Sequence, residues 1–71
     1  MEDTKKIDER IKVMIIRYSA TKDKREAWAK YMAAWRYIAS CKSIIGDEGY
    51  RKWRDRLYDV MAKKLTNNNI N

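Results

Sequence analysis

Apolar residues recur at helical spacing in three stretches of the chain. The first stretch covers about residues 5–18, where apolar positions follow one another at intervals of three and four. Its stripe consists of Ile7, Ile11, Met14, Ile15 and Tyr18. Arg10, Lys12 and Arg17 fall outside this stripe. The pattern predicts an amphipathic helix that buries one side.

The second stretch, residues 22–45, is apolar on two sides. Its denser stripe consists of Trp28, Tyr31, Met32, Trp35, Ile38 and Ala39, with Ile45 at its far end. Its other stripe consists of the dimer-interface candidates Ala29, Ala33, Tyr37, Ser40 and Ile44, most of them small. A helix of this kind is typical of the centre of a bundle or of a dimer interface.

The first two stretches are predicted to be separate helices. No Gly or Pro lies between them, but the apolar stripe shifts by roughly 110° from one to the next, so that a single straight helix would face two directions. We therefore expect a turn at residues 19–21, with Thr21 as the N-cap of the second helix.

The third stretch, residues 48–65, follows a glycine. Gly46 is expected to end the second helix, and Asp47 to cap the third. Its stripe consists of Tyr50, Trp53, Leu57, Val60, Met61 and Leu65. Residues 67–71 show no periodicity, so we expect a single domain over residues 1–66 and a disordered tail.

Composition agrees with an all-α fold. The 71 residues include no proline and two glycines, and strand formers are few. Short connections place neighbouring helices antiparallel. The predicted fold is a small three-helix bundle, and a homodimer through the second helix is the alternative that stays open.

Charge and cysteine content narrow the setting and the partners. The formal net charge of +7 favours nucleic acid or an acidic protein surface as a partner. A single cysteine, Cys41, excludes an internal disulfide and is typical of a reducing compartment. The longest apolar run, Val13 to Ile16, is too short to span a bilayer. We expect a cytoplasmic protein with no membrane span.

Residues for catalysis are scarce. The chain has no histidine, and its one cysteine cannot form a zinc site. The neighbouring acids Asp47 and Glu48 are explained by a helix start, where the dipole favours negative charge. We expect no catalytic residue, no metal, no cofactor and no small-molecule substrate.

Basic and aromatic residues are the candidates for binding a nucleic acid or an acidic partner. Guanidinium and ammonium groups contact phosphates, and exposed rings stack on bases. The candidates are Arg51, Lys52, Arg54, Arg56, Lys63, Lys30, Arg36, Tyr37 and Tyr58. Trp53 belongs to the apolar stripe and is expected in the core. A helix-turn-helix centred on Gly46 is not predicted, because Lys42 and Lys52 occupy positions that need a small residue and a buried one.

Three functions are consistent with these features. The first is a non-catalytic nucleic-acid-binding or accessory protein that contacts phosphates through the third helix. The second is a regulator or inhibitor that docks on a larger protein, since aromatic and Arg side chains dominate binding hot spots; small size and basic charge are typical of phage or plasmid accessory proteins. The third is a self-associating structural subunit.

Overall fold

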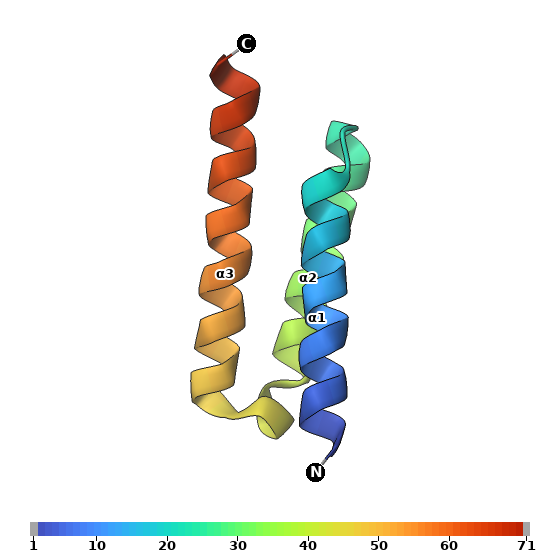
Figure 1. Cartoon of the computed structure of the whole chain (residues 1–71), viewed down its shortest axis with the longest axis vertical. Coiled ribbons are helices and arrows are strands. Elements are labelled where there is room, and N and C mark those ends of the chain that lie inside the picture. The colour runs from blue at the N-terminus through green and yellow to red at the C-terminus, as the bar shows by residue number, and fades with distance from the viewer. Residues whose placement is uncertain (1, 71) are drawn as a thin grey trace.

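Three helices form a small bundle in the computed structural model, which describes the backbone of residues 2–70 and the side chains of residues 4–66. Helix α1 covers Glu2–Ala20, α2 covers Lys24–Ser40, and α3 covers Lys42–Ile70. The chain runs up α1, down α2 and up α3, so α1 and α3 are parallel (Figure 1). The predicted all-α, three-helix fold is confirmed, and the described residues contain no strand.

The break between α1 and α2 confirms two separate helices, but the capping residue was wrongly predicted. Thr21 closes α1, because its Oγ1 donates to the carbonyl oxygen of Arg17 at 2.6 Å. Asp23 is the N-cap of α2 and accepts from the backbone N–H of Glu26 at 2.9 Å. The hydroxyl of Thr21 is therefore engaged by the preceding helix and does not cap the following one.

The second helix ends five residues earlier than the predicted Ile45. The hydroxyl of Ser40 donates to the carbonyl oxygen of Tyr37 at 2.8 Å, a local bond that competes with continuation of the helix. The backbone N–H of Cys41 divides between the carbonyls of Tyr37 and Ile38. One further turn follows, and Gly46 then bends the chain with φ 81° and ψ 171° inside α3.

Gly46→Ala is expected to destabilise the bundle by about 1–3 kcal/mol, the usual cost of holding a non-glycine residue in this region of backbone space. A Cβ at position 46 would meet nothing within 4 Å, so the cost comes from the backbone alone. Urea denaturation followed by circular dichroism measures it. A wild-type midpoint for this variant would contradict the assigned role of Gly46.

The core is built from one buried stripe on each helix. Ile11, Ile38 and Leu57 are completely buried, one from each helix. The remaining buried apolar residues are Ile7, Ile15, Tyr18, Ala27, Tyr31, Ala34, Cys41 and Trp53. The expectation that Trp53 lies in the core is confirmed, and α1 buries four of the five predicted stripe residues.

The buried stripe of α2 differs from the predicted one. The structure buries Ala27, Tyr31, Ala34 and Ile38, a stripe rotated by roughly 75° from the predicted one at about 100° per residue. Trp28 is 61% exposed and Met32 is 37% exposed. Small side chains at 27 and 34 let the other helices approach closely, and the larger indoles lie at the margin.

Two side chains of α3, Trp53 and Lys64, fix this helix against α1 and the turn that follows it in one register. The indole Nε1 of Trp53 donates to Oδ1 of Asp8 at 2.9 Å. Lys64 Nζ donates to the carbonyl oxygens of Ser19, at 3.2 Å, and of Thr21. Trp53–Asp8 and Lys64–Ser19 both join residues 45 apart, as expected for parallel helices with equal rise.

Two further predictions concern a disordered C-terminal tail and the lack of a membrane-spanning helix. The backbone of α3 continues to Ile70, whereas the side chains of residues 67–70 and all of Asn71 lie outside the described part, so the predicted tail over 67–71 stays a prediction. In the described part of the chain, no helix combines the length and apolar character needed to cross a bilayer.

Candidate nucleic-acid interface

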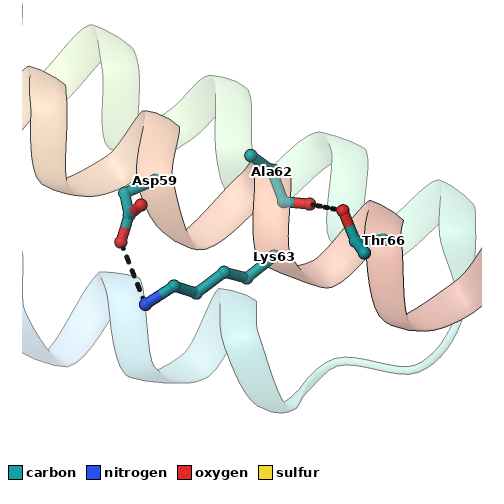
Figure 2. Close-up of polar contacts among 4 residues, drawn as sticks. All are labelled: Asp59, Ala62, Lys63 and Thr66. Carbon is teal, nitrogen blue, oxygen red and sulfur yellow. Dashed lines mark hydrogen bonds and ion pairs between the residues drawn. The ribbon is translucent and has the colours of Figure 1, made fainter.

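Asp55 and Asp59 are the two carboxylates of α3 beyond Gly49, and both form ion pairs with cations of the same helix. Nε of Arg54 lies 3.6 Å from Oδ1 of Asp55. Nζ of Lys63 lies 3.3 Å from Oδ2 of Asp59, one helical turn away, as Figure 2 shows. Farther toward the C-terminus of the same helix, the hydroxyl of Thr66 donates to the carbonyl oxygen of Ala62 (Figure 2). The two ion pairs offset the negative charge of this stretch of α3.

Three of the predicted cations lie in one row along α3. At about 100° per residue, Lys52, Arg56 and Lys63 fall within about 40° of one another around the helix. All three side chains are exposed, and they span eleven positions, about 16 Å of helix. Lys52 and Arg56 make no ion pair with any described residue. We call these three residues the basic row.

The basic row borders a groove between α1 and α3. The groove has a volume of about 690 Å³. Its lining consists of Lys12, Ile15 and Ile16 from α1 and Lys52, Trp53, Asp55, Arg56 and Asp59 from α3. Lys12 thus faces Lys52 and Arg56 across the groove. The two carboxylates that line the groove form ion pairs with Arg54 and Lys63. The groove is therefore a cationic surface with an apolar floor.

The other predicted binding residues lie elsewhere. On α3, Arg54 is half-buried, and its guanidinium lies 5.7 Å from the Tyr50 ring centroid. Arg51 is exposed and lies about 100° around the helix from Lys52. Tyr58 is 60% exposed and also lies off the row. These residues do not form one patch with the basic row.

The predicted residues of α2 contact the turn after α1, contact α1 itself, or lie in open solvent. Lys30 Nζ donates to Oγ1 of Thr21 at 2.9 Å. Tyr37 is half-buried under Arg10, whose guanidinium carbon lies 5.9 Å from its ring centroid. Arg36 is exposed. The structure therefore supports α3, with a contribution from α1, as the place where the predicted cations gather.

The small-residue stripe predicted on the second helix faces away from the core, and its last member, Ile44, belongs to α3 and not to α2. Ala29, Ala33, Ser40 and Ile44 are exposed, and Tyr37 is half-buried. Within residues 24–40, the stripe lies on the outer side of the bundle, opposite the buried Tyr31 and Ile38. The surface is open to a second copy, and the homodimer stays a prediction.

The described residues hold no grouping suited to binding a metal ion. No set of three His, Cys, Asp or Glu side chains among them is placed to bind a metal ion. Cys41 is a free, buried thiol. Burial, and after it the neighbouring Tyr31, raises the pKa of Tyr18. Burial likewise raises the pKa of Tyr37, with the Cys41 thiol adding to the effect. Both phenols therefore stay protonated at neutral pH.

The chain matches no family model, no curated protein and no solved structure. Inference about function therefore starts from the chemistry of the surface alone.

Sequence reasoning missed the α1 side of this surface. Lys12 was recognised as lying off the buried stripe of α1, but a single amphipathic helix does not reveal which flank meets which neighbour. The constant separation of 45 residues between Asp8 and Trp53, and between Ser19 and Lys64, fixes that choice. The spacing of apolar residues in α1 alone does not show which helix faces Lys12.

Proposed function

We propose that this protein acts by binding nucleic acid rather than by catalysis, with phosphates contacted by the basic row of α3 and by Lys12. One observation carries the proposal: Asp55 and Asp59 are held in ion pairs, while Lys52 and Arg56 are exposed without such partners. Phosphate contacts of this kind release condensed counterions and give affinity that does not depend on sequence.

The groove adds shape to this charge. Ile16 is 59% exposed beside Lys12, so the rim carries cations over an apolar wall. The sugars and base edges of a nucleic acid pack their apolar surface against such a wall, while its phosphate oxygens contact the cations. Large apolar side chains left in solvent are typical of interaction sites.

Fluorescence anisotropy with labelled duplex DNA, single-stranded DNA and single-stranded RNA tests the proposal. For four phosphate contacts, from the basic row and Lys12, log affinity is expected to fall with log salt at a slope of about −3.6 on a duplex, which is about 150-fold between about 50 mM and about 200 mM salt. Absence of binding to all three probes at the lowest salt concentration would refute a nucleic-acid role.

A protein-binding role is the second candidate, favoured by apolar side chains on the outer part of α1. Val13 is 44% exposed and Ile16 is 59% exposed, and phosphate binding gives no reason for Val13. Affinity capture from nuclease-treated extract separates the two roles. A partner that survives nuclease treatment and is lost in Val13→Asp supports protein docking, whereas loss of every partner on nuclease treatment counts against it.

Self-association through the exposed small-residue stripe of α2 is the third candidate. In that case Ala33→Glu, which places a bulky charge at the centre of the stripe, is expected to convert a dimer into a monomer in sedimentation velocity. Arg36→Glu, also on the exposed part of α2, serves as a control for charge alone. An unchanged mass for Ala33→Glu would exclude this interface.

A further inference from the structure

The end of the bundle where α1 passes into α2 holds a second hollow, on the other side of α3 from the basic row. Its volume is about 270 Å³. Trp28 of α2 and Met61 and Leu65 of α3 supply its apolar wall, and Lys22, Lys24 and Lys64 supply its charge. None of the described residues that line it carries a carboxylate. We call it the Trp28 pocket. The end of the bundle where α1 passes into α2 is at the top of Figure 1.

One face of the Trp28 indole is covered and the other is open. Its ring stacks on Tyr31, with centroids 5.5 Å apart and planes 20° from parallel. Tyr31 is buried and packs in turn on Tyr18, 5.6 Å away. The residue as a whole stays 61% exposed. Because the covered face is supported by core residues, the open face is held in place before any ligand arrives, which lowers the entropic cost of binding.

The charge around this ring is cationic. Lys22 and Lys24 are exposed and form no ion pair with a described residue. Lys64 donates to the carbonyls of Ser19 and Thr21, and its Nζ lies 5.7 Å from the Tyr18 ring centroid. Hydrogen bonds to neutral carbonyls leave its positive charge uncompensated. An open ring face among three ammonium groups matches a ligand that is flat and anionic.

We propose that the Trp28 pocket is a stacking site for an unpaired base, and that it gives the protein a preference for single-stranded nucleic acid. A base packs on the open indole face while the flanking phosphates meet Lys22 and Lys24. Bases inside a duplex present no free face to such a ring, whereas single strands stack on aromatic side chains with little sequence preference. This proposal rests on the proposed nucleic-acid function and adds a second site to it.

Three variants at one position separate stacking from simple burial. Trp28→Leu keeps apolar bulk without a ring, Trp28→Phe keeps a ring, and Trp28→Ala removes both. Affinities are measured by anisotropy with labelled oligothymidylate and with the same strand annealed to oligoadenylate. Circular dichroism melts check that each variant is folded.

For single strands, Trp28→Leu and Trp28→Ala are expected to weaken binding by about 5- to 150-fold, the range for loss of one stacked base. Trp28→Phe is expected to retain most of the affinity, and duplex affinity is expected to change little in all three. A Trp28→Leu variant with wild-type affinity for the single strand would overturn the proposal.

The remaining outcomes are equally decisive. Failure of the wild-type protein to bind any probe refutes the proposed function, and the stacking site with it. Binding of the wild type that is indifferent to Trp28 refutes the stacking site alone. A dimer that dissociates in Trp28→Leu would show that the pocket is covered by a second copy of the chain, which also overturns the proposal.

Discussion

Leu57→Ala is expected to lower the free energy of unfolding by about 2–5 kcal/mol, the range for a leucine removed from a close-packed core. The Leu57 side chain has 0% exposure and belongs to the cluster in which all three helices meet. Native domains are stable by only about 5–15 kcal/mol. The variant should therefore unfold at a much lower urea concentration than the wild type, as measured by circular dichroism at about 25 °C.

Leu65→Ala is the matched control on the same helix. Its side chain is 54% exposed, so the same substitution is expected to change stability by no more than about 0.5 kcal/mol. Equal losses in the two variants would mean that the assigned buried face of α3 is wrong. The comparison tests the orientation of α3 independently of any ligand.

The double variant Lys52→Gln/Arg56→Gln is expected to reduce the steepness of the salt dependence by about 2, since each lost phosphate contact removes about one unit of slope. Affinity should fall for every sequence alike, because phosphates carry no base information. Titrations of labelled duplex at several salt concentrations measure both quantities.

Its control is Arg25→Gln/Arg36→Gln, which removes the same two charges from exposed positions on α2. If the phosphates lie along the basic row, this control keeps nearly the wild-type slope. An equal reduction by both double variants would show that net charge alone governs binding and that no particular surface does.

Most of the fold was predictable because each helix carries a clear stripe. On α1, isoleucines at 7, 11 and 15 leave little choice of buried side. On α2, however, rings and small side chains compete for the core, and hydrophobicity favours Trp28 over Ala27. Close packing favours the opposite choice, because two alanines admit neighbouring helices where two indoles do not. Side-chain volume therefore overrides hydrophobicity on this helix.

The end of α2 shows a second limit. Gly46 is the strongest helix-breaking signal in the sequence, and it does bend the chain. The earlier break is marked by a local bond, from the hydroxyl of Ser40 to the carbonyl oxygen of Tyr37. Serine makes this bond in some helices and points to solvent in others. Sequence pattern alone does not decide between them.

The candidate surface was predictable only in part for a related reason. The cations at 52, 56 and 63 share a side of one helix, and this follows from spacing alone. The ion pairs of Asp55 and Asp59 depend on side-chain conformations within α3. The position of Lys12 across the groove depends on how α1 docks. Arg51 and Tyr58 are as basic or aromatic as their neighbours, yet the helix turns them to another side.

The parallel pairing of α1 with α3 also governs the order in which the molecule assembles during synthesis. Residues 8 and 53, and residues 19 and 64, meet only after the last helix has left the ribosome. Until then the first two helices form a hairpin whose Ile11 and Ile38 lack the covering that Leu57 provides. The apolar surface of this hairpin therefore stays exposed until α3 packs on it. Contacts between residues so distant in the sequence form slowly.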